Sequence, residues 1–93
     1  MATVVKTEYK HLEARPHPWR KQLYIKGRNM TVWQLIAPAR AENQTPEEVA
    51  KDRGLPLEAV LEAYNYYEKN KALIEAEVEE EKRRLIKKGY KLD

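Results

Sequence analysis

The chain has 93 residues, no cysteine and a formal net charge of +3. This length predicts one domain with a marginal hydrophobic core, for which a second copy or a partner often supplies further contacts. Without cysteine, disulfides, thiolate metal sites and thiol nucleophiles are excluded, and a reducing cytoplasm is favoured. No apolar run reaches the roughly 18 residues that a membrane-spanning helix needs, and the N-terminus lacks the pattern of a signal peptide. We therefore expect a cytoplasmic protein without a membrane partner.

Few side chains are available for catalysis. Serine is absent as well, which leaves threonines, two histidines and carboxylates that mostly lie at helical spacing. His11, Glu13 and His17 could suggest a metal site, but their spacing is loose and the segment is rich in proline, so we interpret them as surface residues. We therefore expect no enzymatic activity, no metal and no cofactor.

The N-terminal part of the chain is basic. Residues 1–30 carry seven Lys or Arg against two Glu, whereas residues 31–70 carry four against seven acids. A basic segment can bind nucleic acid or the acidic face of another copy or partner, although a solvated charged surface explains each half on its own.

Residues 1–22 are predicted to form an extended basic arm, because Pro16 and Pro18 prevent a regular helix. The arm is too apolar to be simply disordered, so we expect it to pack on the body or across a dimer. Its apolar residues are Val4, Val5, Tyr9, Leu12 and Trp19.

Residues 23–93 are predicted to form the rest of the single domain. Leu23 to Lys26 alternates apolar and polar residues, which predicts a short strand that Gly27 ends. Thr31 and Gln34 fit a capping box, so a helix should begin at Val32. Pro38 lies inside this helix and removes one backbone hydrogen bond, so we expect a kink or a restart there.

A second helix is predicted from Pro46 to about Arg53, capped by Thr45. Gly54 supplies the left-handed residue that ends it. A long last helix is then predicted from Leu57 to about Lys88. Its apolar stripe consists of Val60, Tyr64, Tyr67, Ile74, Val78 and Leu85, and it thins beyond Ile74. Two ion pairs, Glu79 with Arg83 and Glu80 with Arg84, and a partner should support this polar end.

The second helix and the start of the third have the spacing of a helix-turn-helix unit. Ala50 allows the two helices to approach, Gly54 makes the turn and Val60 seals the junction. However, Glu58 and Glu62 open the third helix, where a reader of DNA would carry Arg, Lys, Asn or Gln. We therefore expect this helix pair to serve packing rather than insertion into the major groove.

If DNA is bound, the expected phosphate contacts are the basic residues of the arm and strand, beside Trp19 and Tyr24. These candidates are Arg15, Arg20, Lys21, Lys26 and Arg28. The alternative is an ordinary strand edge whose charges prevent aggregation. The residues expected at a dimer or partner interface are Trp19, Tyr24, Tyr64, Tyr67, Ile74 and Val78.

The central part of the chain resembles the bacterial family catalogued as domain of unknown function 433. The resemblance rests on "YIKGRNMTV" followed by "TPEEVAKDRGLPLEAVLEAYNYYEKNKALIEAE", and it spans about Leu23 to Glu81. The arm "YKHLEARPHPWRKQLYIKGRNMTV" resembles the cyanobacterial branch. The resemblance implies a homeodomain-like fold of three helices and an antitoxin of a type II toxin-antitoxin pair, opposite a small nuclease-like toxin of the PIN type. Pro38 and the acidic start of the third helix depart from the family pattern.

The sequence thus leaves three hypotheses. The first is a mainly α, homodimeric antitoxin-like protein with a homeodomain-like helix-turn-helix core, a basic arm with a short strand, and a long C-terminal helix. The second is a DNA-binding transcriptional regulator without a toxin, which would bind operator DNA. The third is a structural dimerisation module in which the arm swaps between protomers.

Overall fold

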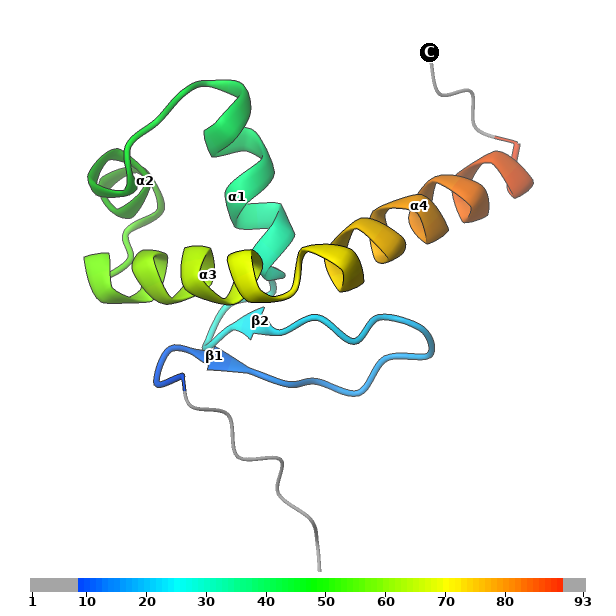
Figure 1. Ribbon diagram of the computed structural model, residues 1–93, viewed down its shortest axis with the longest axis horizontal. Helices are drawn as coiled ribbons and strands as arrows, with labels where there is room; N and C mark the ends of the chain where they lie inside the picture. The colour runs from blue at the N-terminus through cyan, green and yellow to red at the C-terminus, as the bar shows by residue number, and fades with distance from the viewer. Residues whose placement is uncertain (1–8, 90–93) are drawn as a thin grey trace, which may run out of the picture.

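The computed structural model describes residues 9–89, and this part of the chain is mainly helical with a small two-stranded sheet (Figure 1). The strands are β1 (Leu12–Glu13) and β2 (Tyr24–Ile25). The helices are α1 (Val32–Ala41), α2 (Pro46–Arg53), α3 (Leu57–Lys69) and α4 (Lys71–Lys87). Within residues 9–89, no helix is both long and apolar enough to cross a membrane.

Helix α1 begins where the sequence predicts. The Thr31 hydroxyl accepts a hydrogen bond from the Gln34 amide at 3.1 Å, and the Gln34 side chain accepts one from the Thr31 amide at 2.8 Å. This capping box satisfies two of the amides that a helix start leaves without partners. Helix α1 runs through Pro38 and does not restart there, because the proline falls in the last turn and few backbone hydrogen bonds remain to be lost.

Helix α2 also matches its prediction. Thr45 caps it, Pro46 occupies the first turn, and Gly54 ends it in the left-handed conformation with φ of 65°. A second capping box, between Thr45 and Glu48, adds to the predicted cap.

The prediction of one helix from Leu57 to Lys88 is wrong, because the chain breaks at Asn70. This residue has φ of −133° and ψ of 31°, outside the helical region, and it separates α3 from α4. Its side-chain amide donates to the Tyr66 carbonyl at 2.9 Å. Asparagine competes in this way with the backbone hydrogen bonds of a helix, so the break has a local cause.

The charged end of α4 forms one of the two predicted ion pairs. Glu80 accepts from Arg84 at 2.8 Å, as expected, and also from Arg83 at 2.7 Å. Glu79 instead lies 3.6 Å from the ammonium group of Lys82. The expected pair of Glu79 with Arg83 is therefore replaced by two pairs at a spacing of three residues.

The arm packs on the body of its own chain. Strand β1 pairs antiparallel with β2, so that Leu12 lies opposite Ile25. Leu12 is 2% exposed and belongs to the core. The apolar residues Val4 and Val5, on which part of the prediction rested, lie outside the described residues.

The core lies where α1 and α2 pack on α3 and where β1 and β2 cover the opposite side of α3 (Figure 1). The predicted junction residues Ala50 and Val60 are both buried in it. The core residues are Leu12, Ile25, Val32, Leu35, Ile36, Ala39, Val49, Ala50, Val60, Ala63, Tyr66, Tyr67 and Ile74. Helix α4 continues away from this core after its first turns.

Replacing Thr31 with Ala should lower the free energy of unfolding by about 1 kcal/mol. The Gln34 amide would lose the acceptor that the Thr31 hydroxyl supplies, and Thr31 is buried. Urea unfolding followed by circular dichroism measures this change. Thr31→Ser keeps the hydroxyl and is the matched control. Equal stability of the Ala and Ser variants would contradict a role for the capping box.

Candidate functional site

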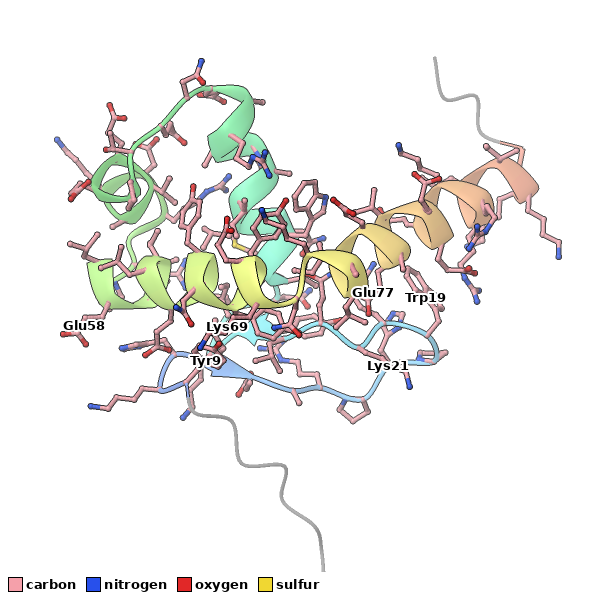
Figure 2. The ribbon with its side chains drawn as sticks, viewed as in Figure 1. Tyr9, Trp19, Lys21, Glu58, Lys69 and Glu77 are labelled. Carbon is pink, nitrogen blue, oxygen red and sulfur yellow. The ribbon has the colours of Figure 1, made fainter. Side chains whose placement is uncertain are left out.

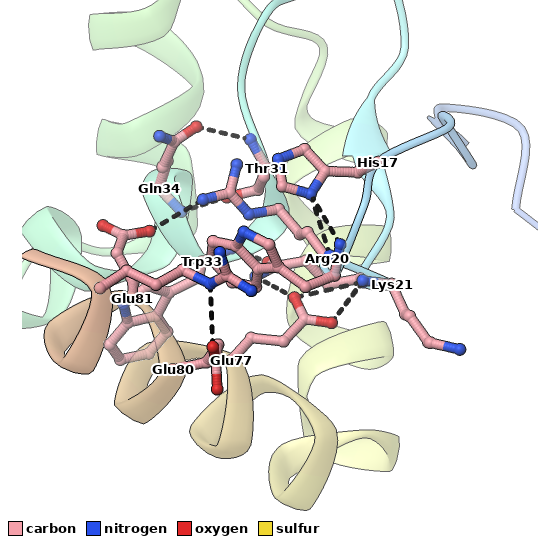
Figure 3. Close-up of polar contacts among 12 residues, drawn as sticks. His17, Arg20, Lys21, Thr31, Trp33, Gln34, Glu77, Glu80 and Glu81 are labelled. Atoms are coloured by element: carbon pink, nitrogen blue, oxygen red, sulfur yellow. Dashed lines mark hydrogen bonds and ion pairs between the residues drawn. The ribbon is translucent and has the colours of Figure 1, made fainter. Parts of the chain in front are cut away.

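The carboxylate of Glu77 holds the arm against α4. It accepts hydrogen bonds from the backbone amides of Lys21 and Gln22, and from the Gln22 side chain at 3.0 Å (Figure 3). The oxygen of the Gln22 side chain in turn accepts from the Trp33 amide at 3.0 Å. Glu77 is only 6% exposed, so these donors replace the water that a buried carboxylate loses. Arm, α1 and α4 thereby form one connected hydrogen-bond network.

A second contact lies one turn further along α4. Arg20 donates to Glu81 at 2.8 Å. The guanidinium groups of Arg20 and Arg84 lie 4.9 and 5.0 Å from the centre of the Trp19 ring. Cations at this distance are attracted by the aromatic ring. The ring of Trp19 therefore holds residues 17–20, the tip of the arm, against α4.

Three of the five predicted phosphate contacts are engaged inside the chain, and Arg15 and Arg28 are the first two. Arg15 donates to Glu13 at 2.7 Å and lies over the ring of Tyr24. Arg28 donates to the carbonyls of Arg53 and Gly54 at 2.9 and 3.0 Å. These carbonyls lie at the C-terminal end of α2, where a cation interacts favourably with the helix dipole. Arg28 thus connects the β2–α1 turn to the turn between α2 and α3.

The other three predicted contacts differ in availability. Arg20 is bound to Glu81, whereas the side chains of Lys21 and Lys26 are exposed. Figure 2 shows Lys21 on the arm next to Glu77 of α4, and in Figure 3 the Lys21 side chain extends away from the Glu77 carboxylate. Lys87 and Lys88, which the sequence reasoning did not single out, line a hollow of about 430 Å³ together with Trp19 and Arg20. The structure therefore brings α4 cations next to the tip of the arm.

The outward face of α3 is apolar and acidic. Leu57 and Leu61, one turn apart, are 38% and 48% exposed. The side chain of Glu58 is 78% exposed, and Figure 2 shows it at the outer end of α3. Exposed leucines at helical spacing are a common feature of surfaces that bind proteins.

The arm also occupies one flank of α3. The amides of Lys10 and His11 donate to the Glu62 carboxylate at 3.3 and 2.8 Å. The His11 ring lies 3.6 Å from Glu58. Glu62, which the sequence suggests as an obstacle to DNA reading, therefore serves as an acceptor for the arm's backbone.

The six predicted interface residues divide into two groups. Tyr24, Tyr67 and Ile74 are 7%, 6% and 0% exposed, so they contact the chain's own core. Trp19, Tyr64 and Val78 are partly exposed. Only the second group offers substantial surface to another molecule.

Two adjoining hollows lie between α1 and α4. The larger, of about 870 Å³, extends from Trp33 and Gln34 to Lys82, Leu85 and Ile86. The smaller, of about 490 Å³, extends from Trp33 toward Tyr67 and Glu75. Trp33, Val78 and Glu79 line both hollows. We call this pair of hollows the α1–α4 groove.

The histidines of the arm have structural contacts. His17 Nδ1 accepts hydrogen bonds from the amides of Trp19 and Arg20, at 3.3 and 3.0 Å, and closes the turn at the arm's tip. Among residues 9–89, no group of three or more His, Cys, Asp or Glu side chains is arranged to hold a metal ion.

The shifted pKa values have simple causes. Burial raises the pKa of the Tyr64 and Tyr66 hydroxyls. The hydrogen bond from Arg83 lowers the pKa of the Glu80 carboxyl, and the same bond raises the pKa of Arg83. These shifts arise from packing and from one surface ion-pair cluster, not from an opposed acid and base in a cleft.

Comparison with known proteins adds no relative: no family model, no curated protein and no solved structure matches this chain.

Replacing Glu77 with Gln should lower the free energy of unfolding by about 2 kcal/mol. The carboxylate accepts from the amides of Lys21 and Gln22 and from the Gln22 side chain, whereas the uncharged side chain of glutamine has a single acceptor oxygen. Chemical unfolding measures this loss, and limited proteolysis of residues 14–21 should become faster. Glu79→Gln, on the exposed surface of the same helix, is the control. If both variants unfold and are cleaved alike, Glu77 does not hold the arm.

Proposed function

We propose that this protein is a non-enzymatic, antitoxin-like protein that acts in the cytoplasm by binding another protein. The partner that the family resemblance implies is a small nuclease-like toxin of the PIN type. A homeodomain-like arrangement of α1, α2 and α3 belongs to the same proposal. In it, the helix-turn-helix unit is a scaffold that presents α3 to the partner.

The observation that carries the proposal is the outward face of α3. In a DNA-reading unit this face would offer cations and amides to the major groove. Here it offers Leu57 and Leu61 together with the exposed carboxylate of Glu58. Such a face is repelled by phosphates but can bury its leucines against a protein.

The use of the chain's polar groups also supports a binding role. Glu77 and Glu62 accept backbone amides, and His17 closes a turn. Groups committed to such contacts are not free to take or give protons to a substrate. The remaining charged groups of α4 form surface ion pairs.

A second candidate function is DNA-binding regulation, with or without a toxin. It is favoured by the exposed side chains of Lys21 and Lys26 and by the position of Lys87 and Lys88 beside the arm's tip. These cations could contact phosphates without any helix entering the major groove.

Replacing Leu57 and Leu61 together with Glu should abolish copurification with the product of the neighbouring gene, because added carboxylates prevent burial of this face. Pull-down after co-expression and rescue of growth measure the effect. Ala76→Glu introduces a carboxylate at an exposed site on α4 and should leave binding unchanged. A neighbouring gene that is harmless alone, with a product that does not copurify, would refute the antitoxin proposal.

For the DNA-binding candidate, Lys21→Gln combined with Lys26→Gln should weaken binding to the protein's own promoter. The slope of log affinity against log salt concentration should decrease in magnitude by about 2. Each phosphate contact releases about one counterion from DNA when it forms, and the variant lacks two such contacts. Fluorescence anisotropy at several salt concentrations measures this slope. Lys51→Gln, an exposed cation on α2, is the control. An unchanged slope would remove the arm from any DNA interface.

A further inference from the structure

The α1–α4 groove is lined by apolar and charged side chains, and no segment of residues 9–89 fills it. Trp33, Val78 and Leu85 are partly exposed along it, and Ile86 is 59% exposed. Figure 1 shows that α1 and α4 diverge from the end of α3, so that the second half of α4 leaves the body. A helix of seventeen residues is about 26 Å long, and most of one side is uncovered here.

Only one side of α4 is open to another molecule. Its other side is covered by the arm, which binds Glu77 and Glu81. The open side carries Val78 at its centre, Glu75 three residues before it and Lys82 four residues after it. Residues at these spacings lie on one helix face, about 10 Å from end to end.

The charges on this open face are not explained by α4 itself. Charges that complement the helix dipole act within the first and last turns, yet the first turn of α4 contains no acid. The side chain of Glu75 has no hydrogen bond or ion pair with any residue between 9 and 89. Lys82 has only a 3.6 Å contact with Glu79, and its side chain is 57% exposed. An acid and a base therefore flank Val78 with their charges largely available.

We infer that a second copy of this chain occupies the groove, with the two α4 helices antiparallel and crossing at Val78. A two-fold axis places identical surfaces against each other, so each contact occurs twice. With the axis beside Val78, Glu75 of each copy lies opposite Lys82 of the other. Val78 and Trp33 of both copies then pack between the two ion pairs, and Glu79 of each copy lies beside them.

The charge pattern selects this occupant and this direction. A parallel pairing would place Glu75 against Glu75 and Lys82 against Lys82, which is repulsive. The antiparallel pairing makes both contacts attractive and buries the face that the arm leaves open. This inference goes beyond the proposed function, because the toxin-facing surface lies on α3, and either surface can fail in experiment without the other.

A charge exchange on the full chain tests the pairing. Sedimentation velocity of the natural protein should show a dimer. Glu75→Lys and Lys82→Glu should each weaken dimerisation at least about tenfold, because each places like charges together twice. An equimolar mixture of the two variants should form a heterodimer of near-natural affinity, since both contacts again join opposite charges.

Two control variants make the same charge changes elsewhere. Lys87→Glu lies nine residues, or about two and a half turns, from Val78 and so on the opposite face of α4. Glu47→Lys changes an exposed residue of α2. Both controls should leave the dimer intact, and circular dichroism should show that all variants fold.

Three results would overturn the inference. The natural protein could be monomeric at every accessible concentration. The single variants could dimerise like the natural protein, or their equimolar mixture could fail to form a heterodimer. The variant with Glu at both Leu57 and Leu61 should still dimerise, so its loss of toxin binding would be distinguished from loss of the dimer.

Discussion

The buried carboxylate of Glu77 is the interaction on which the shape of this protein depends. A carboxylate that is 6% exposed would be costly without donors, and the arm supplies them from its backbone and from Gln22. Because Gln22 also accepts from the first turn of α1, the same network joins three segments that are distant in sequence. Without it, α4 would be held to the body only by Ile74 in the core and by the contacts of Arg20 and Trp19 with Glu81 and Arg84.

The basic residues between positions 15 and 28 have contacts in the structure that differ from those the sequence suggests. In the sequence, the arginines and lysines between residues 15 and 28 suggest a surface for phosphates. In the structure, Arg15 binds Glu13, Arg20 binds Glu81, and Arg28 caps α2. Each guanidinium can donate several hydrogen bonds in a planar arrangement, so arginine suits such contacts better than lysine does. The side chains of Lys21 and Lys26 remain exposed, and the DNA-binding candidate function depends on them.

The break at Asn70 decides which surfaces α3 and α4 present. A continuous helix would carry its apolar stripe in one line from Val60 to Leu85. The break instead redirects α4, so that Val60 on α3 lies in the core whereas Val78 on α4 lines the groove. The two surfaces for which we propose partners, the outward face of α3 and the groove along α4, therefore lie on different elements. This separation is what allows a toxin and a second copy to be proposed at once.

The sequence by itself determined the local structure of this protein. The caps at Thr31 and Thr45, the turn at Gly54 and the core positions Ala50 and Val60 follow from short-range rules, because each depends on residues within one or two helical turns. Only the tertiary structure decided the roles of Glu77, Arg28 and Leu61. The partners of Glu77 and Arg28 lie dozens of residues away, and the exposure of Leu61 depends on which face of α3 the core covers. An acid within a run of acids gives no sign of which one will be buried. Local periodicity reports which residues share a face, whereas the packing of distant segments decides what that face meets.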